Sequence, residues 1–290
     1  MTHLSRNPTG ASAQTPKQRS LWSFLLWPLG VVALIYGISQ LVVWISPYDP
    51  ERTIEKSQLL PPSAQHLFGT DSNGMDIFTR IFAAIENDIL LPVAGVITAL
   101  ILGTIAGVYA GFKGKYLDSL ASRFTEGLQA IPLFLLGLTI VAALGNGATV
   151  LIILIAIVNI PIFFRLSRST TLPLSNADFV LAARGAGLSD FRIITKHLVP
   201  NITVPIVAQF PISCGYGIQV VAGLSFLGIG IPIPSAEWGL MIKDGASILV
   251  YGNWWVSFFP GLAILITVIF FHILGRQISR DYQRWIAGRS

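Results

Sequence analysis

The chain has 290 residues, of which 53% are hydrophobic and 11% charged, and its mean hydropathy is +0.68. Because soluble domains carry about 25% charged residues, this composition excludes a soluble globular protein and indicates a polytopic membrane protein. The formal charge of +5 favours a basic cytoplasmic face over a nucleic-acid partner, and the single cysteine, Cys214, excludes a disulfide framework and a cysteine-based metal site.

Apolar runs along the chain predict an all-α polytopic membrane protein with six transmembrane helices. A helix needs about 20 predominantly apolar residues to cross a bilayer. The six runs are Trp22–Ile45, Asp88–Gly111, Leu117–Leu144, Thr149–Arg165, Ile202–Ile231 and Trp254–Gly275. The third differs from the others, because Arg123 and Glu126 lie in its first turns and Pro132 lies inside it. We expect its membrane-embedded part to begin near Leu128, with neighbouring helices satisfying the backbone at the proline.

Lysine and arginine residues orient these helices. With the amino terminus inside, only four of the 19 lie outside, namely Arg52, Lys56, Arg80 and Lys243. Because basic residues collect on the cytoplasmic side, we predict that both termini are cytoplasmic. Residues 1–21 are then a disordered cytoplasmic tail rather than a cleaved signal sequence. Residues 22–45 are the first span, 46–87 a periplasmic loop, 88–275 a core of five further spans and 276–290 a cytoplasmic tail, with a second outer segment at 232–253.

Enzyme motifs are nearly absent from the chain. The stretch GFKGKY is not a nucleotide-binding P-loop, because Tyr109 and Tyr116 stand where that motif needs glycine and serine or threonine. The four histidines show no metal-ligand spacing. The central parts of the predicted spans contain no Asp, Glu, Lys or Arg, which disfavours an ion-coupled transporter. We therefore expect no metal or cofactor on this chain, and we expect any energy for transport to come from another polypeptide.

The segment between the fourth and fifth spans is charged and carries glycines. Residues 177–184 favour a helix, Gly185-Ala186-Gly187 breaks it, and Ser189 offers an N-cap with Asp190 in the first turn. A second helix follows, with Phe191, Ile194 and Leu198 on one face, and we expect Pro200 to end it. This helix–turn–helix either lies on the membrane surface as an amphipathic hairpin or docks a cytoplasmic partner.

The stretch LAARGAGLSDFRIITKHLVP, residues 181–200, resembles the EAA loop of permease subunits of ABC importers. Ala182, Ala183, Gly187 and Pro200 match that pattern in register, whereas Leu181 replaces its glutamate. The resemblance implies that residues 177–200 form a coupling helix that sits in a cleft of an ATPase subunit. It assigns contact with the ATPase to Leu181, Ala182, Ala183, Arg184, Gly187, Asp190, Arg192 and Pro200.

Two further stretches narrow the resemblance. HLFGTDSNGMDIFTR, residues 66–80, and LSFLGIGIPIPSAEWGLMIKDG, residues 224–245, are similar to segments of peptide, nickel and opine importers. Met75 and Arg276 depart from that pattern, replacing an arginine and an acid. From the three motifs in order, the chain is identified as a member of the second permease subunits of this family, with the fold of type I ABC importer permeases.

This resemblance implies a complex in the bacterial inner membrane. Its expected members are a homologous permease, two cytoplasmic ATPases that hold ATP and Mg²⁺, and an extracytoplasmic binding protein that delivers the solute. Whether the solute is a peptide, an opine or a nickel chelate stays open. The alternative is a stand-alone membrane channel or scaffold without an ATPase partner, and a membrane enzyme is disfavoured by the absence of clustered acids or histidines in the spans.

Two groups of polar residues complete the expected sites. Those expected to dock the binding protein are Asp71, Asp76, Arg80, Glu237, Lys243 and Asp244, although their loop could also serve only as a turn and helix cap. Those expected to line a permissive, low-affinity path through the membrane are Asn159, Gln209, Ser213, Gln219 and Ser225. Gly223, Gly228 and Gly230 permit close helix contact, either for packing alone or along that path.

Overall fold

The computed structural model describes residues 21–232 and 234–287. Except for Leu21, the predicted amino-terminal tail lies outside the described residues, and so does the end of the predicted carboxy-terminal tail. The described chain is helical and contains no β-strand. Its α-helices are α1 (Leu21–Ile45), α2 (Ile77–Ala83), α3 (Leu91–Lys113), α4 (Lys115–Ala130), α5 (Leu133–Leu144), α6 (Ala148–Leu174), α7 (Asp178–Gly185), α8 (Asp190–Ile193), α9 (Val199–Phe226), α10 (Trp238–Ile248) and α11 (Trp255–Ala287).

Long apolar helices confirm the all-α polytopic architecture. Five helical runs among the described residues are long and apolar enough to cross a membrane, and α4 with α5 makes a sixth if the bent pair counts as one span. Two of these runs contain a π-helical turn, at Glu86–Leu90 between α2 and α3 and at Ile194–Leu198 between α8 and α9. A 3₁₀ turn at Leu249–Tyr251 follows α10.

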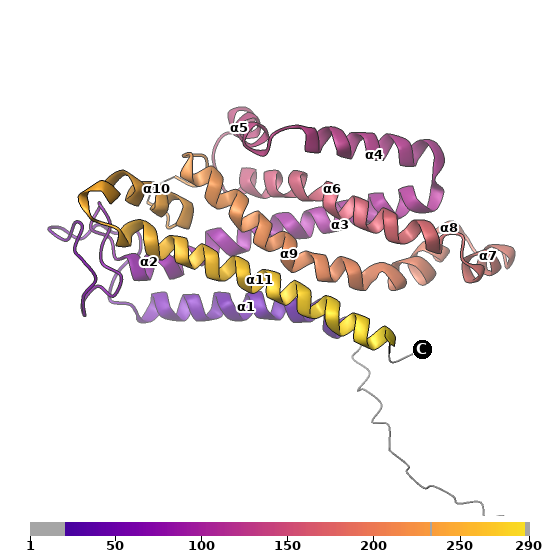
Figure 1. Ribbon diagram of the computed structural model, residues 1–290, viewed down its shortest axis with the longest axis horizontal. Helices are drawn as coiled ribbons and strands as arrows, with labels where there is room; N and C mark the ends of the chain where they lie inside the picture. Colours follow the sequence, from indigo (N-terminus) through magenta and orange to yellow (C-terminus); the bar gives the residue numbers. More distant parts are fainter. Residues whose placement is uncertain (1–20, 233, 288–290) are drawn as a thin grey trace, which may run out of the picture.

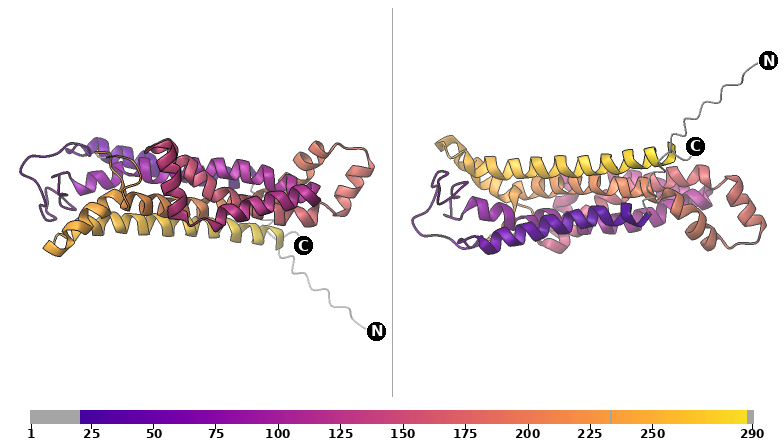
Figure 2. Two further views of the ribbon diagram at one scale, coloured as in Figure 1. Left: turned by 90° about the horizontal axis from the view of Figure 1, so that it is seen from above. Right: turned by 90° about the horizontal axis from the view of Figure 1, so that it is seen from below.

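The long helices lie side by side along one axis (Figures 1 and 2). The loop that follows α1 gathers with α2 and α10 at one end of the bundle, and α7 and α8 project from the other end. The start of α1 and the end of α11 lie at the α7–α8 end, where Val31 packs against Val207 and Leu274. The two predicted outer segments therefore share one end, and the predicted inner segment shares the other with both chain ends.

Glycines bring α3 and α6 into backbone contact. A Cβ atom on Gly103, Gly107 or Gly111 would lie 2.7, 2.4 or 3.0 Å from a backbone oxygen of α6. Small residues four apart allow membrane helices to approach in this way. The spacing is visible in the sequence, although its partner is not, because α4 and α5 separate the two helices along the chain.

The predicted third span is not one straight helix. Ile131 has an extended backbone, as is usual before proline, and α5 turns by 92° relative to α4. The bend at Ile131 divides the predicted span into two helices, and the start of its membrane-embedded part near Leu128 stays a prediction. The helix α4 is amphipathic, and its large apolar side chains Tyr116 and Phe124 are exposed on this chain.

Several predicted boundaries are also corrected. The fourth span does not end at Arg165, because α6 continues to Leu174. Pro200 does not end the second hairpin helix but occupies the first turn of α9, where its missing N–H is not needed. The fifth span ends at Phe226 rather than at Ile231, and α11 continues through most of the predicted carboxy-terminal tail.

Candidate functional site

The hairpin, formed by α7, the turn at residues 186–189, α8 and the π-helical turn, has a small core of its own. Val180, Ala183, Ile193 and Leu198 pack together with Phe112 from the end of α3. The turn depends on Gly187, whose φ of +78° falls in the left-handed region that glycine adopts freely. The predicted helix–glycine turn–helix is confirmed, although Ser189 makes no side-chain capping hydrogen bond.

Two contacts fasten the hairpin to the end of α3. The Lys113 ammonium forms an ion pair with Asp190 in α8. The Arg184 guanidinium lies over the Phe112 ring, 5.2 Å from its centroid, in a cation–π contact. Because α3 itself packs against the backbone of α6, the hairpin is tied to a pair of helices in close backbone contact. Neither contact was predicted, because Lys113 and Asp190 are 77 residues apart along the chain.

Several apolar side chains of the hairpin are exposed on this chain. Phe179, Leu181 and Phe191 are 42%, 50% and 76% exposed, and Ala182 is exposed as well. The predicted apolar face is therefore corrected at Phe191, which points outward, while Ile193 takes the inner position. The other residues assigned to ATPase contact differ in burial. Asp190 is half-buried and Ala183 is buried, and the exposed ones are Arg184, Gly187, Arg192 and Pro200.

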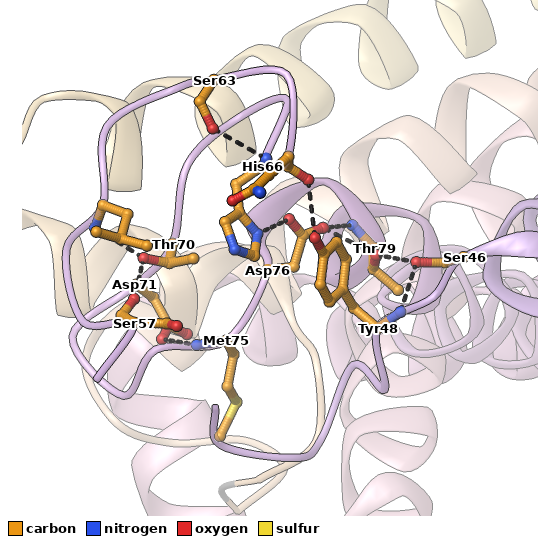
Figure 3. Close-up of polar contacts among 12 residues, drawn as sticks. Ser46, Tyr48, Ser57, Ser63, His66, Thr70, Asp71, Met75, Asp76 and Thr79 are labelled. Atoms are coloured by element: carbon orange, nitrogen blue, oxygen red, sulfur yellow. Dashed lines mark hydrogen bonds and ion pairs between the residues drawn. The ribbon is translucent and has the colours of Figure 1, made fainter. Parts of the chain in front are cut away.

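Polar side chains of the loop before α2 form a buried network at the opposite end (Figure 3). Asp76 caps α2 by accepting hydrogen bonds from the backbone N–H and the hydroxyl of Thr79, at 2.9 and 2.8 Å. Nδ1 of His66 lies 2.9 Å from the other Asp76 oxygen. Asp71 accepts a 2.9 Å hydrogen bond from the backbone N–H of Met75. The network joins the loop to the first turn of α2.

Arg80 links this loop to the segment between α9 and α10. Its Nε lies 3.5 Å from Asp71 Oδ2, and its Nη1 donates to the backbone carbonyls of Pro50 and Pro234 at 2.5 and 3.2 Å. Burial raises the pKa of the Asp71 carboxyl above its usual value, whereas the Met75 N–H and the Arg80 guanidinium lower it. The loop is thus held against the end of the bundle by a charged group with several partners.

Four of the six residues expected to dock a binding protein are buried in this chain. Asp71, Asp76, Arg80 and Glu237 are 5%, 2%, 4% and 0% exposed. Asp71 and Arg80 nevertheless line a cavity of about 350 Å³ with Lys243 and Asp244, and the docking assignment stays a prediction. Lys243 is exposed and Asp244 is half-buried. The Asp244 carboxylate accepts a hydrogen bond from the Ser72 hydroxyl, which lies 2.7 Å from each of its oxygens.

A second buried contact joins the α2–α3 junction to α10. Asp88 accepts a 2.8 Å hydrogen bond from the backbone N–H of Trp238, and Glu237 accepts one from the Ser225 hydroxyl at the end of α9. Within the described chain, one oxygen of each carboxyl group has no hydrogen-bond partner. Burial raises the pKa of Glu237 to about 7, against the Ser225 hydroxyl and the Ile231 N–H, which lower it.

The residues expected to line a membrane path divide into two groups. Asn159, Ser213 and Ser225 are 0%, 1% and 1% exposed, so they are buried in this conformation, and their assignment to a path stays a prediction. Asn159, for example, donates to a backbone carbonyl of its own helix at 2.9 Å. Gln209 is half-buried and Gln219 is exposed, and for these two the assignment also stays a prediction.

The bundle of long apolar helices is that of a polytopic membrane protein. Residues 103–284 match the family of the binding-protein-dependent transport system inner membrane component, and the chain belongs to this family. It is a permease subunit of a binding-protein-dependent importer in the bacterial inner membrane, and it works within a transport complex.

Named relatives agree with this membership. A dipeptide transport system permease protein of Alkalihalophilus pseudofirmus is 40% identical over 77% of this chain and 73% of its own length. A putative peptide transport system permease protein of Brucella abortus is 35% identical over 94% and 93%. A glutathione transport system permease protein of Escherichia coli is 38% identical over 84% and 80%.

Proposed function

We propose that this chain conducts small peptides into the cell. The named substrates of the similar permeases support this, since dipeptides and glutathione are short peptides. The proposed complex contains a homologous permease, two cytoplasmic ATPases that bind ATP and Mg²⁺, and an extracytoplasmic binding protein. This chain itself hydrolyses no ATP. Its binding-protein contacts are proposed for the outer-end residues that remain accessible, Lys243 and Asp244.

The hairpin is the proposed coupling element. The observation that carries this assignment is that the hairpin both packs against α3 and leaves large apolar side chains uncovered. Its buried residues contact Phe112 of α3, while Phe179, Leu181 and Phe191 are exposed. Exposed aromatic side chains at the centre of an interface commonly carry most of the binding free energy. Ala183 and Asp190 act from within, by shaping the hairpin and by holding it on Lys113.

Co-purification with the ATPases tests the coupling assignment. Phe191→Ser removes the most exposed aromatic ring of the hairpin and should weaken ATPase binding by about 30-fold, the effect of losing about 2 kcal/mol at an interface hot spot. Tyr251→Ser is the matched control, because Tyr251 is 81% exposed in the turn that follows α10, and α10 lies at the opposite end of the molecule from the hairpin (Figure 1). Equal retention of the ATPases by both variants would contradict the assignment.

Uptake by cells tests the substrate separately. Cells that carry the complete transporter should accumulate a labelled dipeptide, and deletion of this chain should abolish that uptake. Uptake of a nickel chelate or an opine, without peptide uptake, would replace the peptide assignment and leave the coupling role of the hairpin intact.

A further inference from the structure

A cavity of about 400 Å³ lies beside the bend between α4 and α5, against α6 and α9. Its walls are largely apolar side chains such as Ile157 and Ile162. Three polar side chains reach its lining: Gln129 at the end of α4, Arg165 in α6 and Tyr216 in α9. The cavity is therefore an apolar recess with one cation.

The cation belongs to the second half of α6, and its side chain is exposed on this chain. Arg165 is nine residues before the end of α6 at Leu174, which is about 13 Å along the helix axis. It is level with Gly107 of α3, because Gly107 packs against the carbonyl of the preceding residue, Phe164. Arg165 therefore lies at the predicted cytoplasmic end of the fourth span, where a long basic side chain can reach the aqueous interface.

Arg165 differs in its partners from the next arginine on the same helix. The Arg168 guanidinium forms two parallel hydrogen bonds with the carboxylate of Asp118 and is thereby neutralised. Arg165 donates from Nη1 to the side-chain oxygen of Gln129, a neutral group. Within residues 21–232 and 234–287, no carboxylate lies at ion-pair distance from Arg165. Among the described residues its charge has no anionic partner, and it lies at the edge of an open cavity.

The chemistry of this recess selects a ligand class. A guanidinium has five N–H donors in a planar fork that matches a carboxylate, and Arg165 uses one of them on Gln129. The apolar walls suit the aliphatic part of the same molecule. We propose that this cavity is a transient subsite for the free carboxylate of the transported solute, with Arg165 as its anchor. The proposal rests on the proposed function, because a short peptide carries such a carboxylate.

A cysteine introduced into the cavity lining tests the electrostatic half of the proposal. Ile162→Cys places a thiol in the cavity lining, whereas the native Cys214 is fully buried. In the assembled complex, the measured quantity is the ratio of two modification rates of this thiol, by a negatively charged and by a positively charged methanethiosulfonate. This charge-selectivity ratio should be higher with Arg165 present than in the same reporter carrying Arg165→Gln. The expected change in the ratio is about tenfold for one charge at close range.

Matched variants complete that measurement. Arg165→Lys should preserve the ratio, because the charge remains. Arg123→Gln should also preserve it, because Arg123 is an exposed cation of α4 outside the cavity lining. An unchanged ratio in Arg165→Gln would overturn the proposal. A thiol that reacts in the isolated chain but not in the complex would show that the partner permease fills the cavity, which also overturns it.

Ligand protection tests the carboxylate half. Dialanine should slow the modification of the reporter thiol by an uncharged reagent, and dialaninamide should not, because it lacks the carboxylate. Arg165→Gln should remove the protection by dialanine. Equal protection by the two peptides, or protection by neither, would overturn the subsite. Failure of the proposed peptide function is detected by a different measurement, the absence of dipeptide uptake by the wild-type transporter. The effect of Arg165→Gln on the charge-selectivity ratio does not depend on that result.

Discussion

Replacing Gly107 by alanine should separate α3 from α6. The added Cβ would lie 2.4 Å from the backbone oxygen of Phe164 and 3.0 Å from Cβ of Ser167. Because ordinary carbon–oxygen contacts are about 3.3 Å or longer, the two helices must part by about 0.9 Å at this point. The obstacle is backbone, so no side-chain rotation relieves it, and the same movement loosens the contacts of Gly103 and Gly111.

The expected effect is about 2 kcal/mol of destabilisation. Overpacking of a well-packed contact costs about 1–3 kcal/mol, and this contact should lie at the upper end because neither backbone can yield locally. Alanine recovers about 1 kcal/mol through its higher helix propensity. Gly127→Ala on α4 is the control, because nothing lies within 4 Å of its Cβ position, and it should gain up to about 1 kcal/mol.

Thermal stability of the purified protein measures the difference between the two alanine variants. A difference of about 3 kcal/mol corresponds to a gap of about 5–10 °C in Tm, with Gly107→Ala the lower. Size-exclusion chromatography after heating gives the fraction that remains folded at each temperature. If Gly107→Ala melts at the same temperature as Gly127→Ala, the close backbone contact between α3 and α6 does not stabilise the protein.

Three further outcomes are expected. Gly187→Val should lower ATPase stimulation, because a left-handed backbone costs about 1–2 kcal/mol for a residue with a side chain. Gly185→Ala should preserve the stimulation, because this glycine is in open space and has no positive φ. Equal ATPase rates in the two variants would show that the turn at Gly187 is not needed for coupling. Burial raises the pKa of Glu237 from 4.5 to about 7. The folded state therefore binds this proton more tightly and should lose about 3 kcal/mol of stability as pH rises from 4.5 to 7. Tm should fall less across that range in Glu237→Gln, and the same slope of Tm against pH in both proteins would refute the assignment. Asp118→Asn should cost about 1 kcal/mol, since its partner Arg168 is partly exposed, and an unchanged Tm would show that this ion pair contributes nothing.

The long helices and the hairpin turn were predictable because their signals are local. A run of about 20 apolar residues suffices to predict a spanning helix. The turn at Gly187 needs only a glycine between two helix-favouring segments, and the structure places a left-handed residue there. The bend at Ile131 could be anticipated from Pro132, although its angle depends on the packing of α5 against α6 and α9.

The outer end could not be predicted, because its polar residues are satisfied by distant partners. The carboxylate of Asp88 meets the backbone of Trp238 across 150 residues of chain, and Ser72 meets Asp244 across 172. A local cluster of charged and turn-forming residues is typical of a solvated surface, which is why a docking surface was expected there. The same reason hid the length of α6, since Arg168 is polar in sequence but paired with Asp118 in the structure.

The contact between α3 and α6 also constrains how the chain is made. Synthesis must proceed from Lys113 to Leu174 before the second helix of the pair is complete, and at roughly 5–20 residues per second this takes about 3–12 s. During that interval α6 is not yet made, so the glycine face of α3 lacks the helix that packs against it in the folded chain. The bend at Ile131 then lets the chain return α6 to its place beside α3. Slowed or interrupted synthesis between α4 and α6 should therefore leave α3 in the bilayer with this face open to quality-control proteases, even though every helix made up to that point is correct.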